Sequence, residues 1–287
     1  MASEETKNVP FETLVLGPGG AKGYLHLGAL ALLHKHRLLS HVKNYIGVSI
    51  GAIVSLLLVC GYSPIDIITI AIKIDLFSSL SLMRVWNNLK KRMGLLSIHP
   101  MRHILEKLVQ RKFKTVPTLE ELYHHTGLTF TIVTNNISKS HGAEYLNYKN
   151  SPKLSCVEAV IMSANVPFLF LNYKYQDGLY IDGATVNPYP VDITPGDRSV
   201  LGLYLDNEDE KQSSSSASAY LFRVIQSPIR EIYRRNREQA KHAHHLCLLG
   251  KTHDTLGISL TIQERALMIL DGYGQAYDYV KEKGLLT

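Results

Sequence analysis

Residues 44–60 read NYIGVSIGAIVSLLLVC, and this stretch decides the fold class. An apolar strand pattern over residues 44–48 runs into a helix pattern over residues 50–60. The two meet at GVSIG, which fits the motif G-x-S-x-G and has Ser49 at its centre. The motif requires a sharp strand-to-helix turn that exposes the serine hydroxyl, with small residues on either side. Taken alone it fits a nucleophilic serine, but it also fits a serine that caps a helix in a tight glycine turn.

Strand and helix patterns alternate along the rest of the chain. Further strands are expected over residues 13–16, 128–137, 143–148, 179–181 and 200–205, and helices over residues 22–39 and from Ser63-Pro64 onward. Capping-box pairs mark three more helix starts, namely Thr118 with Glu121, Ser155 with Glu158 and Thr261 with Glu264. This alternation predicts an α/β fold whose central, largely parallel sheet is flanked by helices.

The composition is that of an ordinary globular protein. Hydrophobic residues make up 45% of the 287 residues, so the chain can bury a large core without disulfides. The three cysteines are Cys60, Cys156 and Cys247, and their wide spacing argues for a reducing compartment and against a zinc site. The polar N-terminus does not resemble a secretory signal, and the longest apolar run is shorter than the roughly 20 residues of a membrane span. We therefore expect a cytoplasmic protein that needs no cofactor or metal.

The net charge of +6 suits an anionic partner, although it also serves solubility alone. We find no pattern of base-reading or stacking residues, so nucleic acid is not the expected partner. Arg230, Arg234, Arg237 and Lys241 recur at spacings that form one stripe on a helix. A second basic cluster, formed by Arg84, Lys90, Lys91 and Arg92, surrounds Trp86. Both sets fit peripheral contact with an anionic membrane, and both also fit ordinary solvated surfaces.

A glycine-rich turn, GPGGAKG at residues 17–23, joins the first expected strand to the first helix. It spells neither the dinucleotide-binding fingerprint nor a P-loop. Backbone N–H groups of such a turn can form an oxyanion hole, and a parallel sheet would bring the turn to the same edge as Ser49. The alternative is a glycine turn that serves only close packing.

A serine nucleophile needs a base, and Asp182 follows a strand pattern directly. A carboxylate beside the serine hydroxyl can take its proton if it stays ionised. Asp177 is a nearby rival, but Asp177-Gly178 is typical of a hairpin turn. Sequence spacing alone leaves both carboxylates open.

Taken together, these blocks resemble the patatin-like phospholipases. LGPGGAKG at residues 16–23, GVSIG at residues 47–51 and DGA at residues 182–184 occur in the family's order. SANVPFLF at residues 163–170 and DGATVNPYP at residues 182–190 resemble two further family segments. The resemblance covers residues 14–206.

The resemblance implies a patatin-like three-layer sandwich and a serine esterase that cleaves fatty-acyl ester bonds of lipids without calcium. Its Ser–Asp dyad would consist of Ser49 and Asp182, without histidine. The oxyanion donors would be Gly19, Gly20 and Ile50, and the matching motif glycines are Gly17, Gly23, Gly47, Gly51 and Gly183. The family usually has glycine where this chain has Pro18, which has no N–H to donate.

We expect the patatin-like domain over residues 11–206, a flexible Ser-rich loop over residues 207–219, and a helical C-terminal part over residues 220–287 packed on the same domain. A rival enzyme class is an α/β-hydrolase with a Ser-Asp-His triad. Its histidine would be His242, His244, His245 or His253, although the cluster HAHH reads as helix. A catalytically inactive lipid-binding protein is the other alternative.

Overall fold

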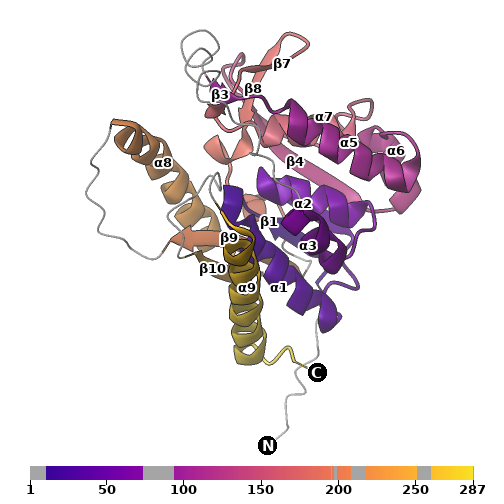
Figure 1. Ribbon diagram of the computed structural model, residues 1–287, viewed down its shortest axis with the longest axis vertical. Coiled ribbons are helices and arrows are strands. Elements are labelled where there is room, and N and C mark those ends of the chain that lie inside the picture. The colour runs from indigo at the N-terminus through magenta and orange to yellow at the C-terminus, as the bar shows by residue number, and fades with distance from the viewer. Residues whose placement is uncertain are drawn as a thin grey trace, which may run out of the picture.

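The protein is described by a computed structural model that covers residues 11–73, 94–194, 196, 199–207, 217–250 and 260–286. Its described part is built on an eight-stranded sheet with the order β10-β9-β1-β2-β4-β8-β7, and β5 pairs with β4 (Figure 1). The strands are β1 (Thr13–Leu16), β2 (Asn44–Val48), β4 (Thr129–Asn136), β5 (Ala143–Leu146), β7 (Tyr173–Tyr175), β8 (Gly178–Asp182), β9 (Val200–Asn207) and β10 (Ala243–Gly250).

The neighbours from β10 through β9, β1 and β2 to β4 all run parallel. β5 and β8 run antiparallel to β4, and β7 runs antiparallel to β8. A small separate sheet pairs β3 (Gly94–Leu96) with β6 (Phe168–Phe170). The prediction of a largely parallel sheet is therefore confirmed.

The helices are α1 (Gly23–Lys35), α2 (Ile50–Val59), α3 (Pro64–Lys73), α5 (His99–Phe113), α6 (Leu119–Thr126), α7 (Cys156–Ser163), α8 (Ala217–Gln239) and α9 (Ile262–Glu282). A single 3-10 turn, η1 (Gly20–Lys22), follows β1. Two more, η2 (Gly183–Thr185) and η3 (Pro190–Ile193), follow β8.

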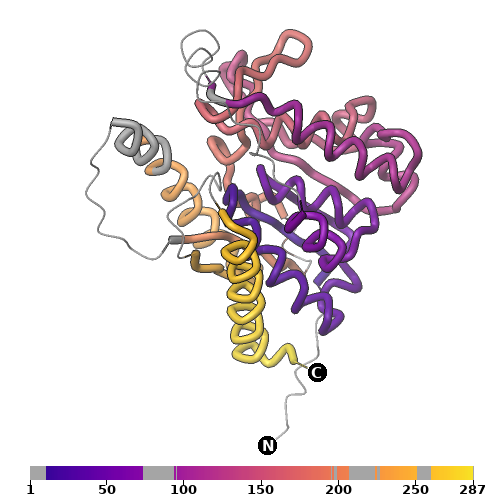
Figure 2. Tube along the Cα trace, in the orientation of Figure 1, coloured from indigo at the N-terminus to yellow at the C-terminus, as the bar shows by residue number. Residues whose placement is uncertain are grey.

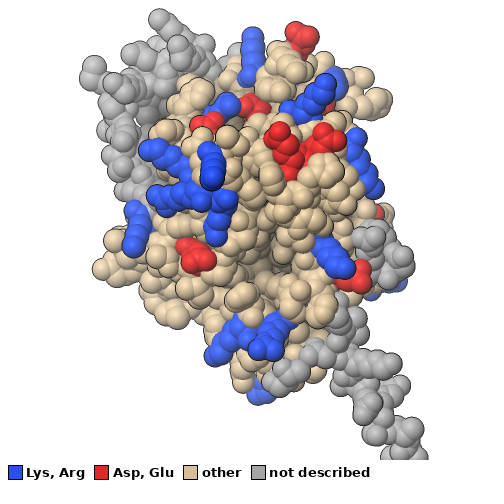
Figure 3. Space-filling view, turned by 90° about the vertical axis from the view of Figure 1, so that its right-hand side faces the viewer, with Lys and Arg blue, Asp and Glu red and all other residues tan. Residues whose placement is uncertain are grey.

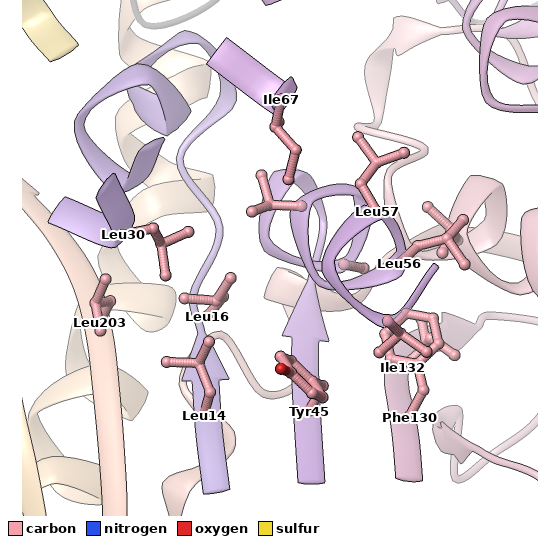
Figure 4. Packing of buried hydrophobic residues seen from close by; sticks show 14 of the residues in the cluster. Leu14, Leu16, Leu30, Tyr45, Leu56, Leu57, Ile67, Phe130, Ile132 and Leu203 are labelled. Carbon is pink, nitrogen blue, oxygen red and sulfur yellow. The ribbon is translucent and has the colours of Figure 1, made fainter. Parts of the chain in front are cut away.

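Two cores lie on opposite faces of the sheet, because successive side chains of a strand alternate between faces. On one face Leu14 and Leu16 of β1 and Tyr45 of β2 pack under α1, α2 and α3, as Figure 4 shows for Leu30 and Leu56. The second face carries a smaller cluster of Val15, Ile46, Tyr189, Val191, Val200, Tyr204, Ala240 and Ala243, on which Tyr233 of α8 packs. Helices on both faces make the expected three-layer sandwich.

The last helix, α9, packs closely on the first. A Cβ at Gly28 of α1 would lie 1.9 Å from the carbonyl oxygen of Ile269, and one at Gly272 would lie 2.1 Å from that of Leu25. The two backbones can approach this closely because neither glycine has a side chain. Figure 2 shows the yellow C-terminal helix alongside the indigo first helix.

The predicted helical state of HAHH is wrong. His244 and His245 lie on β10, which pairs in parallel with β9 along its whole length. The open edge of β9 offers a ladder of backbone hydrogen bonds, and such tertiary pairing overrides local propensity. Residues 220–287 are therefore not wholly helical, since they complete the main sheet.

Of the expected Ser-rich loop, residues 208–216 lie outside the described residues. Asn207 ends β9, and residues 217–219 begin α8.

Two of the three predicted capping boxes form completely, at Thr118 and Thr261. At α7 only half of the box forms, because the Ser155 hydroxyl accepts the Glu158 N–H while the Glu158 carboxylate binds elsewhere. That carboxylate makes a 2.7 Å ion pair with Arg102 and accepts a hydrogen bond from Tyr173.

Across the described residues, none of the helices has the length and apolarity needed to cross a membrane.

Candidate active site

Ser49 stands at a strained turn between β2 and α2. Its φ of 56° and ψ of −122° are unusual for a residue other than glycine. A Cβ at Gly47 would lie 2.5 Å from the Cα of Ala52, and one at Gly51 would lie 2.2 Å from the Leu16 carbonyl oxygen. The turn therefore depends on both motif glycines, as the nucleophile-elbow motif requires.

Asp182 ends β8, and its side chain is buried beside the serine. Its carboxylate accepts a hydrogen bond from the Ala184 N–H at 2.8 Å. Burial raises the pKa of Asp182 to about 6, although the nearby Ser49 side chain and the Ala184 N–H act in the opposite direction. The group is ionised at neutral pH and basic enough to take up a proton.

The register of the sheet explains how residues so far apart in sequence meet. Val48, just before the serine, pairs with Val133 of β4, and the next β4 residue, Thr134, pairs with Asp182. Because β5 pairs with the opposite edge of β4, β2 and β8 follow one another along the same edge, and this brings Ser49 next to Asp182.

One short segment holds both residues by their backbones. The Ser163 hydroxyl, at the end of α7, accepts the Ser49 N–H at 3.0 Å. The Asn165 carbonyl accepts the Asp182 N–H at 2.9 Å. The small-residue stretch SANVP could be recognised in the sequence, but nothing in its pattern showed which residues it would bind.

The glycine-rich turn lies next to the serine. A Cβ at Gly51 would lie 2.7 Å from the Gly17 carbonyl oxygen, and one at Gly23 would lie 2.5 Å from Cγ1 of Ile50. The Gly17 N–H donates to the Leu203 carbonyl at 3.0 Å, so it extends the sheet and cannot serve as an oxyanion donor.

Of the expected oxyanion donors, Gly20 begins η1 and Ile50 begins α2, and the first N–H groups of a helix have no intrahelical acceptor. Gly19 is extended, with a φ of 171°, and Gly20 is left-handed, with a φ of 54°. This turn can thus present backbone N–H groups even though Pro18 has none. Gly183, the last motif glycine, packs against β4, where a Cβ would lie 2.1 Å from the Val133 oxygen.

The rival residues lie elsewhere. Asp177 lies in the tight connection between β7 and β8, which confirms the predicted hairpin turn. His245 uses both ring nitrogens, one with the Tyr189 hydroxyl at 2.9 Å and one with the Ala240 carbonyl at 3.0 Å. His242 bonds Thr194 at 2.9 Å, His244 packs edge-on against Phe11, and His253 lies outside the described residues. β10 is separated from β2 by two strands, so it does not bring these histidines to Ser49.

The expected basic stripe on α8 is interrupted. Arg234 pairs with Glu231 and Glu238, each at 2.8 Å, and Lys241 lies beyond the helix, which ends at Gln239. The second basic cluster, around Trp86, lies outside the described residues. On the face formed by the right-hand side of Figure 1, Lys and Arg side chains are spread over several places, with Asp and Glu side chains among them (Figure 3). Within the described ranges, no group of three or more His, Cys, Asp or Glu side chains could hold a metal ion.

Comparison with known proteins shows which families and structures this architecture is similar to. The profile of the patatin-like phospholipases matches residues 14–195. A probable lipid hydrolase, 463L of Invertebrate iridescent virus 6, is 28% identical over 185 residues, which are 64% of this chain and 63% of that protein. The uncharacterized protein R571 of Acanthamoeba polyphaga mimivirus is 24% identical over 71% of this chain and 68% of its own. The match thus spans less than two thirds of the iridescent-virus protein.

Two solved structures have the same fold. VipD from Legionella pneumophila superposes with a TM-score of 0.58 at 16% identity, over 95% of this chain and 67% of VipD. ExoU of Pseudomonas aeruginosa, in its complex with SpcU, superposes with a TM-score of 0.55 at 17% identity, over 97% of this chain and 53% of ExoU. The profile match ends just before β9. Because it covers well over half of the chain, this protein belongs to the patatin-like phospholipase family.

Proposed function

We propose that the protein hydrolyses fatty-acyl ester bonds in lipids through a Ser49–Asp182 dyad. The observation that carries this proposal is the position of Ser49, at a strained strand-to-helix turn, next to the buried carboxylate of Asp182 on the same edge of β4. Membership of the patatin-like phospholipase family and the similarity to a probable lipid hydrolase support a lipid ester as the substrate.

In the first half-reaction the Ser49 oxygen attacks the acyl carbon while Asp182 takes the hydroxyl proton. The tetrahedral intermediate then expels the alcohol, which receives the proton from Asp182, and leaves an acyl ester on Ser49. In the second half-reaction Asp182 takes a proton from water, and the resulting hydroxide attacks the acyl carbon. The proton returns to the Ser49 oxygen as the fatty acid leaves.

Both half-reactions place negative charge on the former carbonyl oxygen. We assign its stabilisation to the N–H groups of Gly19, Gly20 and Ile50, since preorganised donors are most effective at the position where charge develops. The loss of a donor at Pro18 leaves the turn with two N–H groups beside that of Ile50. This chemistry calls for no calcium and no cofactor.

The contacts of the histidines favour the dyad over a Ser-Asp-His triad. His245 is held by Tyr189 and Ala240, and the described strand that carries it lies on the far side of β1 from β2.

A lipid substrate also requires contact with a membrane or lipid interface. The net charge of +6 supports anionic lipid as that contact, although Arg234 is already paired with glutamates.

The test is hydrolysis of a soluble short-chain ester and of phospholipid vesicles in the presence of a chelator, with products identified by mass spectrometry. Ser49→Ala and Asp182→Asn should each lower kcat by orders of magnitude at an unchanged circular dichroism spectrum, as groups acting as one unit do. Asp177→Asn and His245→Gln serve as matched controls that retain most activity. If a histidine variant of normal stability is as inactive as Ser49→Ala, the dyad is wrong. A folded wild-type chain that releases no acyl group from any lipid would support the inactive lipid-binding alternative.

A further inference from the structure

Helix α8 lies beyond the residues that match the family profile, yet it covers the second face of the catalytic sheet. Figure 1 shows it on the opposite side of the sheet from α1 and α2. Its Tyr233 ring stacks on Tyr189, with centroids 5.5 Å apart and planes inclined by 19°, and it lies 5.8 Å from the ring of Tyr204. The side chain is therefore held in one orientation by two aromatic neighbours.

This orientation brings the Tyr233 hydroxyl against the glycine-rich turn. A Cβ placed on Gly17 would lie only 2.5 Å from that hydroxyl oxygen, whereas the next atoms, the carbonyl oxygens of Leu203 and Pro188, would be 3.4 Å away. Gly17 begins the turn, and its carbonyl oxygen lies against Gly51 of the serine turn. The hydroxyl thus contacts the backbone at the point where the chain leaves β1 for the proposed oxyanion hole.

The same hydroxyl is buried and has no hydrogen-bond partner among the residues that the structure describes. Leaving a buried hydroxyl unpaired costs about 1–3 kcal/mol, and phenylalanine would fill the same aromatic cluster without that cost. An unpaired group of this kind calls for an explanation other than stability. Burial above all, together with neighbours that include Asp206 and Asp182, keeps the pKa of Tyr233 well above its ordinary value, so the hydroxyl stays neutral.

Helix α8 is also fixed to the segment that follows the proposed base. One turn beyond Tyr233, the Asn236 amide donates to Asn187 Oδ1 at 2.7 Å, to the Tyr189 carbonyl at 3.0 Å and to Asp192 Oδ1 at 3.2 Å. These three acceptors lie within ten residues of Asp182. A single helix therefore contacts both the glycine-rich turn and the loop after Asp182.

We propose that Tyr233 is a positioning residue of this site, whose hydroxyl packs against Gly17 and keeps the N–H groups of Gly19 and Gly20 directed at Ser49. The role rests on the proposed ester hydrolysis, in which those groups bind the oxyanion. It makes α8 part of the active site, and it explains why a buried hydroxyl without a partner is placed there. Small displacements of positioning groups are costly, since a shift of about 1 Å can lower a rate by about two orders of magnitude.

The first experiment compares Tyr233→Phe with Tyr204→Phe, which removes a hydroxyl from the same aromatic cluster without touching the glycine-rich turn. Tyr233→Phe should lower kcat on a soluble ester about tenfold while KM and the melting temperature do not fall. Tyr204→Phe loses its 2.7 Å bond from Arg237 and should keep the wild-type kcat. A Tyr233→Phe variant with the wild-type kcat would overturn the proposal.

A compensating pair sharpens this result. Gly17→Ala should lower kcat, because the new methyl group must displace the Tyr233 hydroxyl, its nearest contact. In the double variant Gly17→Ala/Tyr233→Phe the methyl group takes the space of the missing hydroxyl, so kcat should recover above that of Gly17→Ala. If the two losses simply multiply, the hydroxyl does not act through Gly17 and the inference is wrong.

Hydrogen exchange separates this inference from the proposed function, because it requires no activity. Amides of residues 17–23 should exchange faster in Tyr233→Phe than in the wild type or in Tyr204→Phe. Unchanged exchange over this turn overturns the role of Tyr233 even in an active enzyme. A chain that hydrolyses no ester but shows the faster exchange contradicts the proposed function and leaves the packing role of Tyr233 supported.

Discussion

The hydroxyl of Ser163 accepts the backbone N–H of Ser49 at 3.0 Å, although 114 residues separate the two in the chain. Both residues are buried, so no solvent can replace the bond. A non-glycine residue with the backbone angles of Ser49 is strained by about 1–3 kcal/mol and persists only where its surroundings hold it. We therefore regard Ser163 as a support of the strained turn.

Ser163→Ala should lower kcat about ten- to a hundredfold with little change in KM, because the unpaired Ser49 N–H lets the turn relax. Ser55→Ala is the matched control, since Ser55 is a buried serine of α2 whose hydroxyl has no partner in the described part of the chain. It should keep full activity and gain stability. Steady-state kinetics on a soluble ester, with melting curves, measures both, and equal effects of the two variants would contradict the support role.

Ester hydrolysis should have an acid limb that reports Asp182. Burial raises the pKa of this carboxyl to about 6, and only its ionised form can take the serine proton. The value of kcat/KM should therefore be level above pH 7 and fall tenfold per unit well below pH 6. A profile on an uncharged ester between pH 4 and 9 measures this, and activity that stays level down to pH 4 would exclude Asp182 as the base.

Asp182→Asn should raise the free energy of unfolding at pH 8. The folded pKa of Asp182, about 6, exceeds its ordinary value of 3.8, so the stability from its protonation is full below 3.8 and is lost as pH rises through 6. The buried carboxylate then costs up to about 3 kcal/mol, which the neutral amide avoids. Urea unfolding at pH 8 and pH 4 tests this expectation, since the gain should be large at pH 8 and small at pH 4.

His26 should make the fold sensitive to acid. Its ring is fully buried in α1, and neither nitrogen has a partner among the described residues. Burial lowers the pKa of His26 from 6.5 to about 3, so below pH 6.5 the unfolded state binds a proton that the folded state refuses. Stability should then fall by about 1.4 kcal/mol per pH unit from this residue.

His26→Leu should remove that dependence and stabilise the protein at every pH, because it replaces an unpaired polar ring by an apolar side chain. His34→Leu, on the exposed face of the same helix, is the control and should leave the slope unchanged. Chemical unfolding from pH 7 to pH 5 gives both slopes, and parallel slopes for the wild type and His26→Leu would refute the assignment.

The sequence by itself determined the local architecture of this protein. The strand-turn-helix pattern around Ser49 predicted β2, the elbow and α2, because an apolar strand, a glycine-flanked serine and an apolar helix follow one another directly in the chain. The same holds for Asp182 at the end of β8 and for the capping boxes at Thr118 and Thr261, whose partners lie three residues away.

Only the tertiary structure decided features whose partners lie far along the chain. HAHH became a strand because the free edge of β9 offered it a ladder, and Glu158 left its capping box because Arg102 and Tyr173 bind its carboxylate more completely. The contacts of Ser163 with Ser49 and of Tyr233 with Gly17 have no sequence signature, since a hydroxyl group carries no mark of its partner. Their physical basis is the folded sheet, which brings segments far apart in the sequence together and fixes which buried polar groups can meet.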